Sequence, residues 1–118
     1  MIRSDEINGI TILSLDGILS IREGASLKEM FSELPHQKVI VDMQQLTHID
    51  SAGLGVIVEL LKLAEEQGGA IKLCSMNKSV LHVFTLTRLH HIFEIYNSCD
   101  EALQAFRHQS PPADESQC

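Results

Sequence analysis

Residues 39–67 have the sequence VIVDMQQLTHIDSAGLGVIVELLKLAEEQ, and this stretch decides the fold class. It opens with the β-branched run Val39-Ile40-Val41, closed by Asp42-Met43, which is typical of a strand covered on both faces. Residues 44–50 are expected to form a loop, and a helix is expected from Ala52 to Gln67. A buried strand followed by a helix is the building unit of α/β folds.

The predicted helix has a clear amphipathic pattern. Its apolar stripe consists of Leu54, Ile57, Val58, Leu61 and Ala64. Its polar face is expected to expose Glu59, Lys62 and Glu66 to water. Gly68-Gly69 is a typical helix end, because glycine readily adopts the left-handed conformation found there.

The same kinds of element continue upstream. The run from Ile10 to Leu15 predicts a strand that ends at Gly17. Residues 2–7 are a candidate edge strand, and Asn8-Gly9 is a typical hairpin turn between the two.

A helix is expected between these strands and residue 39. Ser26-x-x-Glu29 matches a capping box at its start, and Pro35 is a stop signal. Its inward face is expected to carry Leu27, Met30, Phe31 and Leu34.

Downstream of the glycine pair the pattern repeats. Ile71–Cys74 predicts a strand, a helix capped by Asn77 follows to Leu86, and Ile92–Tyr96 predicts a last strand. Ser98 or Asp100 is expected to cap a final helix. The prediction is an α/β fold: a mixed β-sheet of four to five strands with about four helices packed on it.

The length of 118 residues fits one domain, which we place at residues 1–108. Residues 109–118 are polar and rich in Pro and Ser, which predicts a flexible C-terminal tail.

The net charge of −7 disfavours binding to nucleic acid or to anionic lipid. No apolar run approaches twenty residues and the N-terminus has no signal-peptide core, so we expect a cytoplasmic protein. The cysteines are expected to be free thiols: Cys74, Cys99 and Cys118.

The segment Ile49-Asp50-Ser51-Ala52-Gly53-Leu54-Gly55 needs a special explanation. Each glycine in the first turns of a helix costs about 1 kcal/mol relative to alanine. Either the glycines let a partner approach the backbone, or they allow tight packing of the helix on the sheet. Asp50 or Ser51 is a candidate N-cap. A helix N-terminus also accommodates an anion, so a phosphate on Ser51, with about 1.5 to 2 negative charges, is compatible with the fold.

From about residue 8 to residue 107 the sequence resembles the STAS domain, and within it the anti-sigma factor antagonists of bacteria. The segment 49–55 is similar to the most specific motif of that family. Residues 13–19 (LSLDGIL) resemble its early strand and turn, and residues 39–43 resemble its central strand ending in aspartate. Gly68-Gly69 and Leu86-Thr87 fit its later landmarks.

The resemblance implies a phosphorylation-controlled partner switch. We expect no enzyme activity, cofactor or metal. Ser51 would be phosphorylated by a partner that is both an ATP-dependent serine kinase and an anti-sigma factor. The unphosphorylated form would bind this kinase and release its client, and a PP2C-type phosphatase would reset the phosphorylated form. The predicted partner-binding residues are Asp50, Ser51, Ala52, Gly53, Leu54, Gly55, Glu59, Lys62, Asp16 and Gly17.

The chain departs from the family pattern at two positions. Ser20 stands where the family often has an aspartate close to the phosphorylated serine, which puts a partner contact through that residue in doubt. Arg88 replaces a glycine late in the domain, in Thr87-Arg88-Leu89.

Two other function classes are alternatives to this switch. One is a structural STAS subunit of a lipid-transport ATPase or of a stress-sensing complex. The other is a hydrolase using Ser51 with His48 and Asp50, which is disfavoured because Ser51 lacks the glycine two residues before a nucleophile elbow. The six histidines lack zinc-like spacing, and no phosphate-binding loop with a G-K-[ST] ending occurs.

Overall fold

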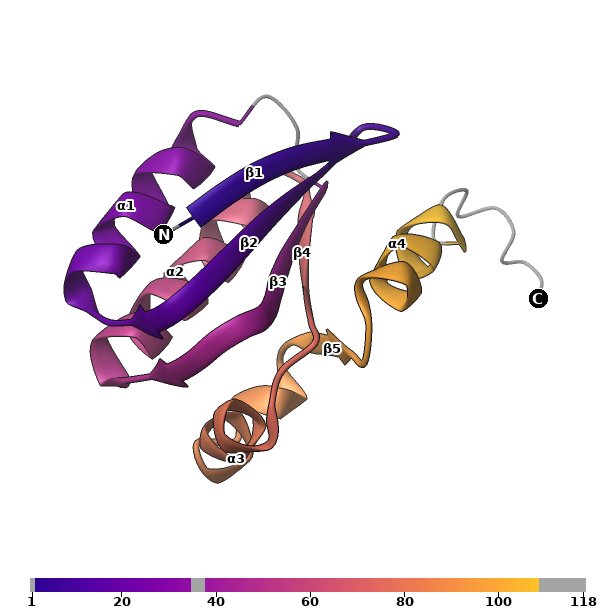
Figure 1. Cartoon of the computed structure of the whole chain (residues 1–118). Coiled ribbons are helices and arrows are strands. Elements are labelled where there is room, and N and C mark those ends of the chain that lie inside the picture. The colour runs from indigo at the N-terminus through magenta and orange to yellow at the C-terminus, as the bar shows by residue number, and fades with distance from the viewer. Residues whose placement is uncertain (1, 35–37, 109–118) are drawn as a thin grey trace.

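A computed structural model describes residues 2–34 and 38–108 and shows a five-stranded sheet with helices on both faces (Figure 1). The strand order is β1-β2-β3-β4-β5, in which β1 and β2 are antiparallel and the other neighbours are parallel. The strands are β1 (Ile2–Ile7), β2 (Ile10–Leu19), β3 (Lys38–Ile49), β4 (Ala70–Cys74) and β5 (Glu94–Tyr96). The helices are α1 (Ile21–Ser32), α2 (Ser51–Glu66), α3 (Lys78–Leu86), the short 3-10 helix η1 (Leu89–His91) and α4 (Cys99–His108). The mixed α/β fold predicted from the sequence is confirmed.

The two faces of the sheet are covered by different helices. Helices α1 and α2 lie side by side on one face, and α4 lies on the other (Figure 1). Within β3 the buried side chains alternate: Val39 and Val41 join the core under α1 and α2, while Ile40 joins the core under α4. The β-branched run therefore forms a strand buried on both faces, as predicted.

Several local predictions are confirmed. Asn8 and Gly9 form the hairpin turn, with φ of 53° and 82°. Asn77 caps α3 by accepting a hydrogen bond from the Val80 N–H at 2.8 Å. Ser98, and not Asp100, precedes α4 and accepts from the Glu101 N–H at 3.1 Å.

Two predicted strand ends are wrong. Strand β2 does not end at Gly17 but continues to Leu19, and residues 44–49 are not a loop but the second half of β3. The two extensions pair with each other in parallel, with two register shifts at which β3 has one residue more than β2. Gly17, at φ 77°, lies next to the second shift. Pairing supplies partners for backbone groups that a lone extended segment would leave unsatisfied.

The start of α1 was also predicted wrongly. The helix begins at Ile21 with Ser20 as N-cap, so Ser26 and Glu29 lie inside it and form no capping box. It ends at Ser32, and Pro35, the predicted stop, lies outside the described residues. On α2 the buried stripe includes Leu60, while Val58 and Leu61 are only half-buried. The predicted tail, residues 109–118, lies outside the described residues.

None of the helices in the described part of the chain combines the length and the apolar character needed to cross a membrane.

Candidate partner-binding site

The candidate site lies where β2 and β3 end and α1 and α2 begin. Leu19 and Ile49 are neighbours across the two strands, and the Asp50 N–H donates to the Leu19 carbonyl oxygen at 3.2 Å. The Thr47 hydroxyl donates to the Gly17 carbonyl oxygen at 2.9 Å. These bonds hold the N-terminus of α2 beside the N-terminus of α1, because a single residue separates each helix from the joined strand ends.

Asp50 caps α2. Its carboxylate accepts a hydrogen bond from the Gly53 N–H at 2.9 Å, and its carbonyl oxygen accepts from the Leu54 N–H at 2.9 Å. Of the two candidate N-caps, the structure therefore uses the aspartate. Ser51 is the first helical residue, and its side chain is exposed.

The Ser51 hydroxyl is available for chemistry from outside. Within residues 2–34 and 38–108 it makes no hydrogen bond, and the Ser51 and Ala52 backbone N–H groups have no acceptor there either. Such N–H groups, together with the positive end of the helix dipole, favour an anion at this position. The geometry thus tolerates a phosphate on Ser51 without requiring one.

The two glycines of the motif have different surroundings. Gly53 is buried, and a Cβ built on it would lie only 2.3 Å from the Leu19 carbonyl oxygen. Gly55 is exposed, and a Cβ there would meet no atom within 4 Å. Gly53 is thus explained by packing of the helix on the end of β2, and the idea that an outside group approaches the backbone applies to Gly55 alone. Leu54 is likewise buried and faces the core.

The polar residues predicted on α2 are exposed, but one of them is paired. Glu59 accepts a hydrogen bond from Lys28 of α1 at 2.8 Å, and both side chains are about half exposed. An ion pair that is this exposed contributes at most about 1 kcal/mol to stability. Lys62 is exposed one turn further along.

Asp16 and Gly17 occupy different surroundings. Gly17 is exposed and tied to Thr47, so it borders the site. Asp16 is opposite Gln45 in the sheet and lines a small cavity of about 120 Å³ with Arg3 and Asp42. It therefore lies among strand residues rather than beside the start of α2.

Sequence reasoning missed two exposed isoleucines next to this site. Ile18, 54% exposed, is opposite His48 on β3, and Ile21, 74% exposed, is the first residue of α1. Large exposed apolar side chains that cluster mark contact surfaces. The sequence does show an isoleucine on each side of the Leu19-Ser20 pair. Because the helix was predicted to start at Ser26, these two isoleucines were not recognised as neighbours of the site.

Ser20, which stands in place of an aspartate of the family, donates a hydrogen bond to the Glu23 carboxylate at 2.7 Å. This bond lowers the pKa of the Glu23 carboxyl below its ordinary value. The first turn of α1 therefore carries a negative charge on Glu23, three residues after position 20.

The geometry gives no support to a hydrolytic site. His48 is exposed, and its Nδ1 atom lies 3.2 Å from the Thr47 hydroxyl oxygen, with no hydrogen bond to Ser51 in the part of the chain that is described. A serine nucleophile needs a base within hydrogen-bond reach. The described His, Cys, Asp and Glu residues also form no group of three that fits a metal ion.

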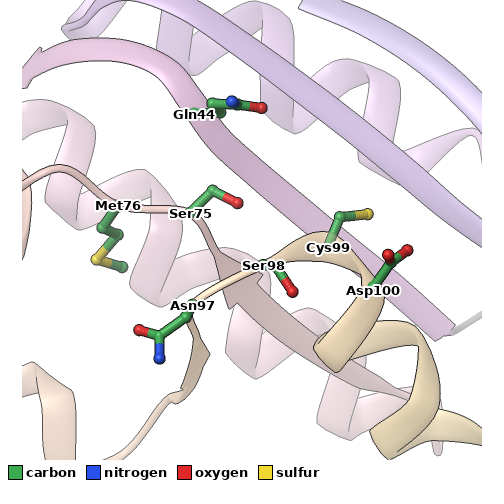
Figure 2. Close-up of a pocket in the computed structure, with 7 residues that line it drawn as sticks. All are labelled: Gln44, Ser75, Met76, Asn97, Ser98, Cys99 and Asp100. Atoms are coloured by element: carbon green, nitrogen blue, oxygen red, sulfur yellow. The ribbon is translucent and has the colours of Figure 1, made fainter.

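A separate open hollow lies at the start of α4 (Figure 2). Its volume is about 430 Å³, and none of the predicted site residues lines it; its walls are Gln44, Ser75, Met76, Asn97, Ser98, Cys99 and Asp100. Burial raises the pKa of the Cys99 thiol and raises that of Cys74 to about 12. Both thiols therefore stay protonated at neutral pH and are poor nucleophiles.

Comparison with known proteins agrees with the architecture. The STAS domain family matches residues 1–102. BtrV of Bordetella bronchiseptica, a protein assigned as an anti-sigma factor antagonist, is 30% identical over 113 residues, which cover 91% of this chain and 95% of BtrV. A crystal structure of a protein from Thermotoga maritima, which is assigned to the same class, superposes with a TM-score of 0.84 at 31% identity and covers 90% of this chain and 94% of that one.

A relative with a different role is also similar. The phospholipid transport system binding protein MlaB of Escherichia coli is 29% identical over 80 residues, which cover 68% of this chain and 79% of MlaB. The family match spans most of the chain, and the relatives that align over nine tenths of it are assigned as anti-sigma factor antagonists. The chain therefore belongs to the STAS domain family.

Proposed function

We propose that this protein is an anti-sigma factor antagonist controlled by phosphorylation of Ser51. The unphosphorylated form binds a serine kinase that is also an anti-sigma factor, and this binding releases the client of the kinase. Phosphorylation ends the complex, and a PP2C-type phosphatase restores the binding form. The observation that carries the proposal is the exposed Ser51 hydroxyl, unbonded within the described residues, on a helix start that Asp50 already caps.

The docking surface consists of the exposed residues around Ser51. Ile18 and Ile21 supply apolar contact area, and Gly55 leaves the first turn of α2 without a side chain that would hold a partner away. Asp50, Glu59 and Lys62 form its polar surroundings, and the half-buried Ala52 and the exposed Gly17 border it. Gly53 and Leu54 contribute from inside by holding the helix start against β2, and Asp16 lies at the margin.

A phosphate acts on this surface and not on the fold. It adds about 1.5 to 2 negative charges within one residue of the Asp50 carboxylate. The helix N-terminus stabilises that charge, so the domain stays folded. A partner that packs on Ile18 and Ile21 would have to remove water from the phosphate, which is unfavourable unless the partner supplies matching cations. The complex therefore dissociates while the protein remains intact.

The proposal is tested by intact-mass analysis after incubation with the partner kinase and ATP. Wild-type protein should gain one phosphate, and Ser51→Ala should gain none. Ser79→Ala is a matched control, because Ser79 is also an exposed serine in the first turn of a helix and should leave the phosphate in place. A phosphate that remains on Ser51→Ala, or none on the wild type, contradicts the mechanism.

The similarity to MlaB favours a second candidate, a structural subunit of a lipid-transport ATPase or of another large assembly. The same surface would then hold a permanent partner, and Ser51 would act as a contact residue. Affinity purification from the source organism separates the two functions. Recovery of a transport ATPase at constant stoichiometry, with binding unaffected by ATP, favours the structural role; recovery of a serine kinase that ATP releases favours the switch. Either role would place the protein in the cytoplasm.

A further inference from the structure

A second group of exposed apolar side chains lies on α3 and η1, which we call the α3–η1 surface. It contains Leu81, Leu86 and Ile92, which are 41%, 69% and 51% exposed. Lys78, His82, Arg88 and His91 are exposed among them. Lys78, Leu81, His82 and Leu86 follow the i, i+3, i+4, i+8 spacing of one helix face, so these side chains form one continuous strip.

The fold does not explain these outward side chains. The inward face of α3 is complete without them, because Val80 and Phe84 are fully buried and the Phe84 ring meets the Phe93 ring edge-on at 5.9 Å. Asn77 fixes the start of α3 to β3 by donating to the Leu46 carbonyl oxygen at 3.0 Å. The helix is thus held by its other face, and three large apolar side chains are left in water.

The charge of this surface is opposite to that of the rest of the protein. All sixteen acidic residues of the chain lie outside residues 67–93, while Lys78 and Arg88 are exposed within that segment. In a chain of net charge −7, the segment that forms this surface therefore interleaves cations and apolar groups and contributes no carboxylate of its own. The backbone at Arg88 is left-handed, with φ 64°, which is uncommon for a residue other than glycine, and this residue joins α3 to η1.

We propose that the α3–η1 surface docks an acidic amphipathic segment of a partner protein. The apolar strip supplies the contact area, and the cations select a segment with carboxylates beside its apolar side chains. A nucleic acid offers no apolar side chains for Leu86 and Ile92, and the strongly acidic remainder of the chain repels it. This surface is separate from the phosphate switch, so the inference does not rest on the proposed function.

The test uses the full chain and a designed helical peptide in which Leu and Glu alternate at helical spacing to form one apolar and one acidic stripe. Titration into ¹⁵N-labelled protein should shift amide resonances within residues 78–92. Affinity should fall at higher salt, and Leu86→Glu should weaken binding at least about tenfold. Ile7→Glu, which places the same change at an exposed isoleucine on β1, should leave binding unchanged, and so should Ser51→Asp. Circular dichroism verifies that each variant is folded.

Four results overturn the proposal. One is that a peptide with the same residues in a different order, which lacks the apolar stripe, binds as tightly as the designed peptide. Another is the absence of shifts in residues 78–92. The third is a protein that does not bind the peptide but binds vesicles of anionic lipid, with the vesicle binding abolished by Leu86→Glu. That result would assign the surface to a membrane. Lys78→Glu serves as a second variant, and unchanged peptide binding by both variants likewise contradicts the inference.

Discussion

The Leu19 carbonyl oxygen occupies the space in which a side chain on Gly53 would begin, 2.3 Å from the Cβ position. That oxygen also accepts the hydrogen bond from the Asp50 N–H, so it cannot move away without breaking the link between β2 and α2. The motif glycine at position 53 is therefore a structural requirement of the site, and the exposed glycine at position 55 is not.

Gly53→Ala should destabilise the protein by about 1–3 kcal/mol, because the added methyl group overpacks a contact with backbone. Gly55→Ala should leave the free energy of unfolding unchanged or raise it by about 0.5–1 kcal/mol, since alanine is the better helix former and the space is open. Urea unfolding of both variants provides the comparison. Equal stability of the two variants would contradict the assignment of different roles to the glycines.

The Asp50 cap gives a second prediction. Asp50→Ala removes the acceptor of the Gly53 N–H and should cost about 1 kcal/mol, while Asp50→Asn, which retains an acceptor oxygen, should cost less. Urea unfolding at neutral pH provides the measurement. If Asn destabilises as much as Ala, the carboxylate acts through its charge and not as a hydrogen-bonding cap.

The extent to which the sequence predicts this structure depends on whether the signal is local. The hairpin at Asn8-Gly9 and the cap at Asn77 follow from short-range chemistry and were predicted correctly. The continuation of β3 to Ile49 was not, because residues 44–49 are extended only through pairing with β2, a partner distant in sequence. Register shifts there also break the alternation that identifies a strand.

The candidate site shows the same division. The motif located Asp50 and Ser51 at the helix start, but sequence could not assign the cap to one of them, since both types are good caps. The contact of Gly53 with Leu19 and the exposure of Ile21 depend on how two separate strand–helix units meet. The spacing of residues within one segment does not predict contacts between two segments that are distant in sequence.

A third prediction concerns the buried lysine under α4. The Lys72 side chain is fully buried, pairs with the Glu94 carboxylate, and places its Nζ atom 4.5 Å from the centre of the Phe106 ring. Burial acts to raise the pKa of the Glu94 carboxyl, but hydrogen bonds from Lys72 and Tyr96 outweigh it and hold that pKa below its ordinary value. A carboxyl with a depressed pKa in the folded state stabilises the fold above its unfolded pKa and loses this effect as the pH falls through the folded value.

The stability difference between wild type and Glu94→Gln should therefore be constant from neutral pH down to about pH 4.5, the ordinary value for a glutamate. At lower pH it should shrink as the wild-type carboxyl takes up a proton. Urea unfolding at a series of pH values measures this difference. Glu29→Gln, at an exposed carboxylate on α1, serves as the control. A difference that grows as the pH falls would show that the pair does not stabilise the charged carboxylate.

The final prediction separates folding from docking at the switch. Ser51→Asp places a negative charge at the first residue of α2, where the helix dipole favours it by about 0.3–1 kcal/mol, and the neighbouring Asp50 carboxylate offsets part of that gain. The free energy of unfolding should therefore change by no more than about 0.5 kcal/mol. Binding to the partner kinase, measured by calorimetry, should be lost, whereas Ser51→Ala should bind and remain bound when ATP is added. Ser79→Asp, which makes the same change at the start of α3, should bind like the wild type. Loss of binding together with loss of folded structure in Ser51→Asp would mean that the serine serves the fold, and full binding by a folded Ser51→Asp would mean that charge at this position is not the signal.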